Sequence, residues 1–152
     1  MNIDFELIKS LYANTTKEES ENEDIIEPME YLDKNKLYDN YKYYENIGKH
    51  AIQEGKLAAV TMAGGQGTRL GHSGPKGTYD IGLDSHKSLF ELLSDGLKEA
   101  GKKYDVTIPW FIMTSRENNE ETVNFFEKNR YFGYQKDKNI FFFIQGELPM
   151  VD

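Results

Sequence analysis

The sequence has no cysteine, only four prolines, and no long apolar run. Without cysteine there can be no disulfide bond and no thiolate metal site, and this composition fits a reducing compartment. No window holds enough consecutive apolar residues to cross a bilayer, and the acidic N-terminus lacks the basic-then-apolar order of a signal peptide. We therefore expect a cytoplasmic protein that does not enter membranes.

Basic residues are also few, with 18 Lys and Arg against 26 Asp and Glu, for a net charge of −8. This balance disfavours nonspecific binding to nucleic acid or to anionic membranes. A length of 152 residues is enough for one modest domain with a core. An acidic protein of this kind that binds a polyanion must gather its cations locally.

A local cluster of cations follows the apolar run 57–61, which is typical of a buried strand. Four glycines within the segment 64–71 remove side chains from the turn after this strand, so backbone N–H groups can approach a ligand closely. Arg69 and Lys76 add two positive charges beside these donors. The combination predicts a binding site for nucleotide phosphates. We expect the backbone of the loop to lie against the nucleotide, through Met62, Ala63, Gly64, Gly65, Gln66, Gly67 and Thr68.

Two better-known phosphate loops are excluded by their spacing. A Walker A loop requires glycine directly before its lysine, where this chain has Pro75. A dinucleotide fingerprint requires its third glycine at the position of Leu70, and Gly71 comes one residue late. The loop therefore belongs to another class.

The string G-G-x-G-T-R-L-G followed by P-K resembles the signature of sugar-1-phosphate nucleotidyltransferases. With A-G-G-Q before G-T-R-L-G, and P-K-G-x-Y-D after it, the chain looks most like the UDP-sugar pyrophosphorylase family. Within that family it resembles the UDP-N-acetylhexosamine (UDP-N-acetylglucosamine) pyrophosphorylases, since the glucose-specific branch usually reads N-G-G-L-G-T at the loop. The resemblance runs from about Tyr44 to the last residue, with further landmarks in the same order at 81–90, 108–115, 124–126, 131–133 and 141–149.

The resemblance implies a uridylyltransferase that makes UDP-N-acetylglucosamine, or a related UDP-sugar, and pyrophosphate from UTP and a sugar 1-phosphate. Mg²⁺ is expected as a cofactor, bound mainly through the UTP phosphates. A phosphate monoester is already anionic at neutral pH, so the reaction needs aligned anions and charge neutralisation rather than a nucleophile–base pair. Alternatives are a UTP-binding fragment without turnover, a chain that works only when assembled with a separate C-terminal half, and a UDP-glucose pyrophosphorylase.

Specific roles follow from the resemblance. Arg69 is expected to grip the leaving β- and γ-phosphates, and Lys76 to neutralise the α-phosphoryl group, with Pro75 fixing the backbone before it. Gln145 and Gly146 follow an apolar run and match the family segment whose glutamine reads the uracil edge. An amide suits that edge because it carries both a donor and an acceptor. The alternative for Gln145 is an amide satisfied by neighbouring backbone.

No metal ligand is assigned within the chain. Asp80 and Asp84 could bind a metal, but loop aspartates more often cap turns. His72 lies inside the loop and could touch phosphate, but we expect it to face solvent. His50 and His86 lack partners at zinc-ligand spacing. The resemblance implies that the sugar-binding part and the metal-ligating aspartates lie beyond Asp152. Oligomeric state and the choice of sugar stay open.

The apolar pattern predicts an α/β fold with a Rossmann-like, doubly wound, mostly parallel sheet of the nucleotidyltransferase type. Residues 1–50 are expected to form an N-terminal helical extension, and residues 51–152 the nucleotide-binding part of the domain. Tyrosines between 31 and 44 are expected to pack against the α/β body rather than to stack on a base. Strands are predicted at 57–62, 107–114 and 139–144, and helices around Phe5–Tyr12 and at 39–54, 88–100 and 117–128, the third stopping at Gly101 and the last capped by Ser115.

Overall fold

The computed structural model describes residues 4–15, 25–31, 33–35, 37 and 40–146. They belong to two compact units, one formed by residues 1–38 with 146–152 and the other by residues 39–145. In the first unit, helix α1 spans Phe5–Thr15 and confirms the predicted amphipathic helix. Its start is capped by Asp4, whose Oδ1 accepts hydrogen bonds from the backbone N–H groups of Glu6 and Leu7 at 3.1 and 3.0 Å.

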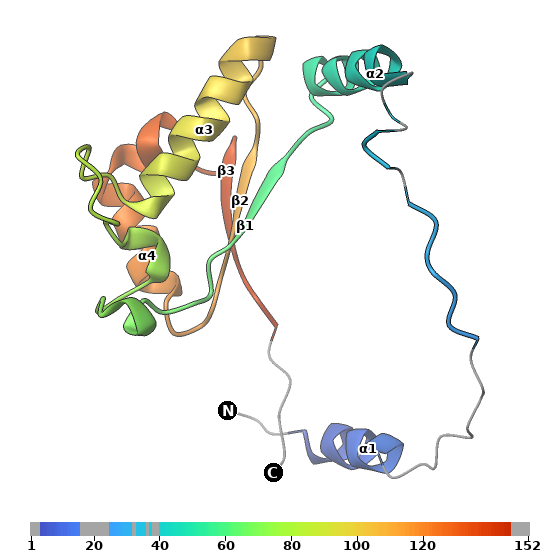
Figure 1. Cartoon of the computed structure of the whole chain (residues 1–152). Coiled ribbons are helices and arrows are strands. Elements are labelled where there is room, and N and C mark those ends of the chain that lie inside the picture. The colour runs from blue at the N-terminus through green and yellow to red at the C-terminus, as the bar shows by residue number, and fades with distance from the viewer. Residues whose placement is uncertain (1–3, 16–24, 32, 36, 38–39, 147–152) are drawn as a thin grey trace. The chain divides into compact units, whose positions relative to one another are not determined.

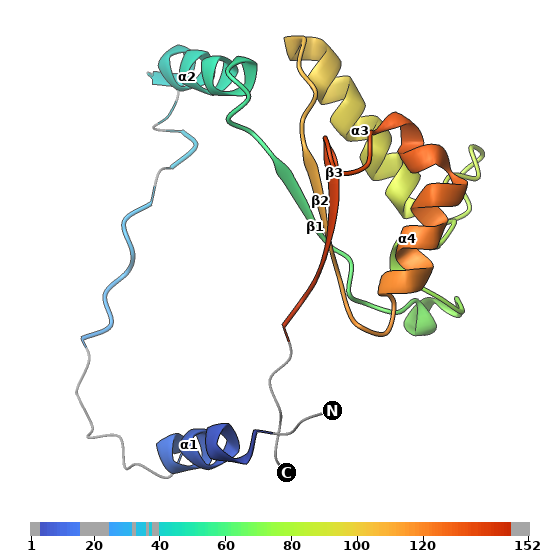
Figure 2. The same cartoon turned by 180° about the vertical axis from the view of Figure 1, so that it is seen from behind.

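The second unit contains a parallel sheet with the strand order β1-β2-β3. Ala59 pairs with Trp110 and Trp110 with Ile140, so the strands run in register from one edge of the sheet to the other. Two helices, α3 and α4, connect the strands and lie on the same side of the sheet (Figures 1 and 2). In chain order the elements are α2 Tyr41–Gln53, β1 Ala59–Met62, α3 Leu89–Tyr104, β2 Trp110–Thr114, α4 Asn119–Lys128 and β3 Ile140–Ile144. The α/β class and the parallel sheet are therefore as predicted.

Helix α3 begins at the predicted position but ends later than expected. Ser88 caps it by accepting a hydrogen bond from the backbone N–H of Glu91 at 3.2 Å. The prediction that it stops at Gly101 is wrong, because the helix continues to Tyr104 and ends at Asp105, which has a left-handed φ of 55°. Glycine is needed at position 101 because the backbone of Val106 comes close to it. A Cβ there would lie 2.5 Å from the carbonyl oxygen of Val106. The glycine thus lets the next segment fold back against the helix.

Helix α4 also begins slightly differently from the prediction. Asn118, not Ser115, is the N-cap residue, and the helix starts at Asn119 rather than at 117. Ser115 contributes by accepting a hydrogen bond from the backbone N–H of Asn118 on its Oγ at 3.3 Å. Ser115 and Asn118 therefore both contribute to the turn that leads from β2 into α4.

The core lies between the sheet and the two crossover helices. Trp110 and Ile112 from β2 and Phe126 from α4 are completely buried. The Phe126 ring lies 5.4 Å from the Trp110 ring and 4.8 Å from the Phe90 ring of α3, so one aromatic cluster joins both helices to the sheet. This packing fixes the edge of the sheet at which the candidate site forms.

The tyrosines near α2 do not pack as predicted. Tyr41, Tyr43 and Tyr44 are exposed, with 62%, 63% and 44% of their surfaces accessible, and α2 has no buried residue. The prediction that they pack against the α/β body is therefore wrong for these three residues.

In the described part of the chain, none of the helices combines the length and the apolar character that a membrane span requires.

Candidate functional site

The predicted motifs meet at one edge of the sheet. The glycine-rich segment follows β1, Ser115 follows β2, and Gln145 follows β3. Backbone hydrogen bonds extend the ladder past the strands, from Ala63 N–H to the Met113 carbonyl at 2.7 Å and from Gln145 N–H to the Thr114 carbonyl at 2.8 Å. Ligands of parallel α/β sheets bind at this carboxyl edge.

The glycine segment closes into a compact loop (the glycine loop, residues 63–78). An antiparallel bridge joins Gln66 to Pro75. Gly67 N–H donates to the Gly74 carbonyl at 2.8 Å, and Lys76 N–H donates to the Gly65 carbonyl at 3.0 Å. The bridge brings the backbone of Lys76 beside the Gly-Gly pair, although eleven positions separate Lys76 from Gly65 in the sequence.

The first bend of the glycine loop carries three free donors. Among the described residues, the backbone N–H groups of Gly64, Gly65 and Gln66 make no hydrogen bond. Gly65 and Gln66 are exposed and Gly64 is half-buried, so solvent or a ligand can reach this bend. Consecutive unpaired N–H groups of this kind bind anions.

A buried asparagine forms hydrogen bonds with the backbone of the same bend. Asn118 is 0% exposed, and its Nδ2 donates to the carbonyl of Ala63 at 2.9 Å and to that of Gly65 at 3.5 Å. Asn118 is not among the site residues predicted from the sequence. Its only sequence signal is an asparagine before a helix, which is common wherever a helix begins.

Arg69 and Lys76 lie on two short 3₁₀ turns of the glycine loop, Thr68–Leu70 and Lys76–Thr78. Both side chains are exposed, and within the described part of the chain neither has a hydrogen-bond or ion-pair partner. The fold thus brings both cations onto the loop and leaves their charge available. Pro75, buried with φ of −58°, precedes Lys76 as the sequence suggested.

His72 braces the second half of the glycine loop. Its Nε2 lies 2.7 Å from Thr78 Oγ1, and Thr78 in turn donates to the Pro75 carbonyl at 2.9 Å. The ring is half-buried and lies 5.3 Å from the Tyr79 ring, so the expectation of a solvent-facing histidine is wrong. A Cβ at Gly67 would lie 2.8 Å from His72 Cβ, which explains why the loop needs glycine there.

Gln145 contacts the glycine loop directly. A Cβ built on Gly64 would lie 3.2 Å from Gln145 Oε1, so the amide lies over the backbone of the first bend. No described backbone or side-chain group hydrogen-bonds this amide, so it is not satisfied by neighbouring backbone. Gly146 follows Gln145 directly and is exposed.

Asp80, which follows the glycine loop, has structural partners. Asp80 Oδ1 accepts a hydrogen bond from Gly82 N–H at 2.8 Å, and Oδ2 lies 3.2 Å from His86 Nδ1. The hydrogen bond from Gly82, followed by that from His86, lowers the pKa of Asp80. Asp80 therefore caps a turn, as expected. Within the described ranges, no three histidine, aspartate or glutamate side chains are grouped so as to hold a metal ion.

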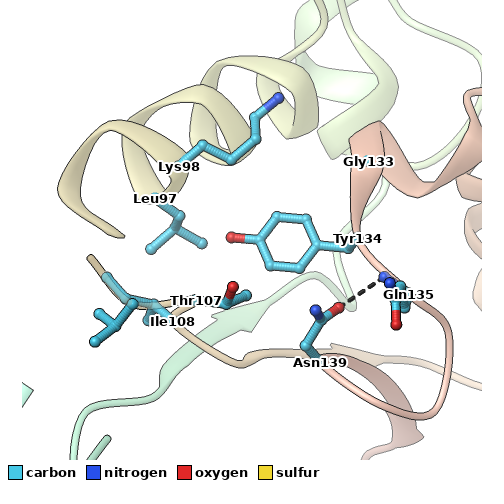
Figure 3. Close-up of a pocket in the computed structure, with 9 residues that line it drawn as sticks. Leu97, Lys98, Thr107, Ile108, Gly133, Tyr134, Gln135 and Asn139 are labelled. Carbon is cyan, nitrogen blue, oxygen red and sulfur yellow. Dashed lines mark hydrogen bonds between the residues drawn. The ribbon is translucent and has the colours of Figure 1, made fainter. Parts of the chain in front are cut away.

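Two hollows lie away from the first bend. One of about 270 Å³ lies at the opposite, amino edge of the sheet, lined by Leu97, Ile108 and Tyr134 among others (Figure 3). Burial raises the pKa of Tyr134 in this hollow. The other, of about 550 Å³, lies between His72 and α4 and is lined by Glu117, Glu120 and Glu121. Three carboxylates do not suit a triphosphate, so the first bend itself is the better candidate.

Comparison with known proteins agrees with this geometry. The family model described as UTP–glucose-1-phosphate uridylyltransferase matches residues 5–152. The chain belongs to this family. The curated relatives that it matches include UDP-N-acetylglucosamine pyrophosphorylase of Saccharomyces cerevisiae, 43% identical over 151 residues, which cover 95% of this chain and 31% of the yeast protein. UDP-N-acetylglucosamine diphosphorylase 2 of Arabidopsis thaliana is 46% identical over 124 residues, covering 74% of this chain and 24% of that protein.

A solved structure of the family shares the fold. The crystal structure of the uridine diphosphate N-acetylglucosamine pyrophosphorylase from Trypanosoma brucei in complex with inhibitor matches with a TM-score of 0.69 and 30% identity, covering 96% of this chain and 30% of that chain. These matches confirm the nucleotidyltransferase-type fold and the resemblance to the acetylhexosamine branch. The chain spans about a third of the length of the yeast relative.

Proposed function

We propose that this chain is the UTP-binding part of a uridylyltransferase that makes UDP-N-acetylglucosamine and pyrophosphate from UTP and N-acetylglucosamine 1-phosphate. The observation that carries the proposal is the first bend of the glycine loop, with three free N–H groups beside Gln145 and two unpaired cations on the same loop. The names of the curated relatives support the acetylglucosamine product over UDP-glucose.

The chemistry follows from the groups that are present. The sugar phosphate oxygen attacks the α-phosphorus of UTP, the bond from that phosphorus to the β-phosphate oxygen breaks, and pyrophosphate leaves. The role of Arg69 is to hold the leaving phosphates in its planar fork of donors. Lys76 acts as a point charge on the α-phosphoryl oxygens, where negative charge builds up as the bond changes. The N–H groups of the first bend and Gln145 hold and orient the nucleotide.

Mg²⁺ belongs to the proposal as an ion that enters with UTP. Among the described residues no three histidine, aspartate or glutamate side chains are grouped so as to hold a metal ion. We expect the ion to be bound mainly through the oxygens of the UTP phosphates. Bound there, the ion neutralises phosphate charge. Cytoplasmic location and the absence of nucleic-acid and membrane partners stay predictions from composition, as does the division at residue 50.

A second candidate is a UTP-binding chain without turnover. The observation that favours it is the coverage of about a third of the yeast relative, because the sugar 1-phosphate must be held by groups that the described residues do not identify. In this case turnover requires the other part of the family fold.

Calorimetric titration with UTP and Mg²⁺, beside a pyrophosphate-release assay with N-acetylglucosamine 1-phosphate, tests both candidates. Binding with turnover supports the first, and binding without turnover supports the second. Arg69→Ala should weaken UTP binding, whereas Lys102→Ala, which removes an exposed cation in the last turn of α3, should not. If the unmodified chain does not bind UTP, both candidates are wrong.

A further inference from the structure

Asn118 lies where the turn after β2 meets the glycine loop, and it uses its whole side chain there. Its Oδ1 accepts a hydrogen bond from Ser115 N–H at 2.9 Å. Its Nδ2 donates to the carbonyls of Ala63 and Gly65, at 2.9 and 3.5 Å. The acceptor and the donors thus face different partners, so the network fixes which way round the amide lies.

The hydrogen bond to Ala63 sets the direction of one peptide group in the loop, and the longer one to Gly65 adds to the hydrogen bond that Lys76 N–H makes to the same carbonyl. The chain has no cis peptide bond among its described residues, and in a planar trans peptide the C=O and N–H point in opposite directions. The Ala63 carbonyl shares a peptide group with Gly64 N–H, and the Gly65 carbonyl shares one with Gln66 N–H. Asn118 holds the Ala63 carbonyl, whereas the Gly65 carbonyl is held by Lys76 N–H at 3.0 Å with Asn118 Nδ2 as a second, longer donor. The Gly64 and Gln66 N–H groups therefore point away from these donors, and among the described residues they have no hydrogen-bond partner.

We propose that Asn118 is a positioning residue of the nucleotide site: by holding the Ala63 carbonyl it aims the Gly64 N–H group at UTP, and it assists Lys76 N–H in holding the Gly65 carbonyl and so in aiming the Gln66 N–H group. This inference rests on the proposed function, since it assigns the residue that shapes the same site. It makes UTP affinity depend on a side chain that is completely buried and does not touch the nucleotide.

The test substitution is Asn118→Asp, which keeps the shape of the side chain and the acceptor for Ser115 N–H but replaces the two donors by an oxygen. That oxygen faces the carbonyl oxygens of Ala63 and Gly65 and repels them. The Ala63–Gly64 peptide group is then no longer held, and the Gly65–Gln66 group keeps only its hydrogen bond from Lys76 N–H. Asn119→Asp is the matched control. It adds the same charge one residue later and keeps an acceptor for Thr114 Oγ1, which donates to Asn119 Oδ1 at 2.7 Å.

The experiment measures UTP dissociation constants by calorimetry, and backbone amide chemical shifts by NMR, for the unmodified chain and both variants. Asn118→Asp should weaken UTP binding by about tenfold or more and shift the amide resonances of Gly64 and Gln66, because two hydrogen bonds are lost. Asn119→Asp should change UTP affinity by less than about threefold and leave these resonances in place.

Several outcomes decide the matter. Equal affinities in the two variants, or unmoved Gly64 and Gln66 resonances, would overturn the inference while leaving the proposed function intact. No UTP binding by the unmodified chain would instead remove the proposed function. If Asn118→Asp does not fold, Asn118→Ser decides, because serine buries no charge and its shorter side chain cannot reach both carbonyls. Its UTP affinity should fall by about threefold or more, and an unchanged affinity would overturn the inference.

Discussion

The side-chain amide of Gln145 lies against Gly64, so that a Cβ at Gly64 would lie 3.2 Å from Oε1 and 3.4 Å from Nε2 of the glutamine. The contact joins the end of β3 to the loop that follows β1. It also explains the first glycine of the loop, because any larger residue would push the amide away. The proposed reader of the uracil edge and the proposed phosphate bend are thus in direct contact.

Gly64→Ala should therefore displace the Gln145 amide by a few tenths of an ångström without straining the backbone. We expect UTP affinity to fall by roughly fivefold and the preference for UTP over CTP to narrow, since a hydrogen bond to the base is weakened. Calorimetry with both nucleotides measures the effect. The control is Gly96→Ala in α3, where an added Cβ meets nothing within 4 Å. An unchanged preference for UTP would show that Gln145 does not read the base.

Lys76→Ala separates binding from chemistry. We expect the affinity for UTP to change by no more than a few-fold. The value of kcat, measured on the chain alone or together with the other part of the family fold, whichever turns over, should fall by about a hundredfold or more. The reason is that the lysine acts on charge that develops in the transition state. Calorimetry and pyrophosphate release measure the two quantities, with Lys102→Ala as the control. Equal losses in affinity and turnover would make Lys76 a binding residue only.

Gly77 is expected to matter for stability. A Cβ at this position would overlap the ring of Phe90, which is 1% exposed and belongs to the core. Gly77→Ala should lower the free energy of unfolding by about 1–3 kcal/mol, as overpacked cores do. Gly96→Ala, which meets nothing in a helix, should be neutral or raise it by up to about 1 kcal/mol. Urea denaturation of both variants gives the comparison, and equal stabilities would contradict the prediction.

Asp95 predicts an acid-dependent loss of stability. Hydrogen bonds from Lys87 and then Lys98 lower the pKa of its carboxyl group. Since the folded pKa lies below the unfolded one, the contribution is complete at pH values above the unfolded pKa of about 4 and is lost as the pH falls through the folded pKa. In Asp95→Asn, the free energy of unfolding should fall less steeply with acid below about pH 4.

The control for this measurement is Asp84→Asn. Asp84 is exposed and, among the described residues, has no hydrogen bond or ion pair. Denaturant unfolding across the acid range compares the two variants with the unmodified chain. Identical slopes for Asp95→Asn and the unmodified chain would show that the pair with Lys87 and Lys98 does not contribute.

The strands and the place of the site could be predicted from local pattern. The apolar runs before Ala63, Ser115 and Gln145 are strong signals, and the carboxyl ends of parallel strands meet at one edge whatever the details. Helix α2 was likewise found within about two residues of its predicted ends.

The internal support of the loop could not be predicted in this way. Asn118 Nδ2 reaches Ala63 across 55 positions of sequence, and no local pattern encodes such a contact. The prediction for Gly101 fails for a related reason. A glycine can end a helix or can allow another segment to approach the backbone closely, and only the position of Val106 shows which role applies here. His72 could be assigned to Thr78 only once the bridge between Gln66 and Pro75 had folded the loop.

The bridge between Gln66 and Pro75, Asn118 and the His72–Thr78 pair hold the glycine loop in its conformation through contacts within the protein alone. A triphosphate that binds this loop as proposed has to order little of the polypeptide. The entropic cost of binding therefore comes mainly from the nucleotide. The heat released on capture should then vary little with temperature, because almost no apolar surface changes its hydration.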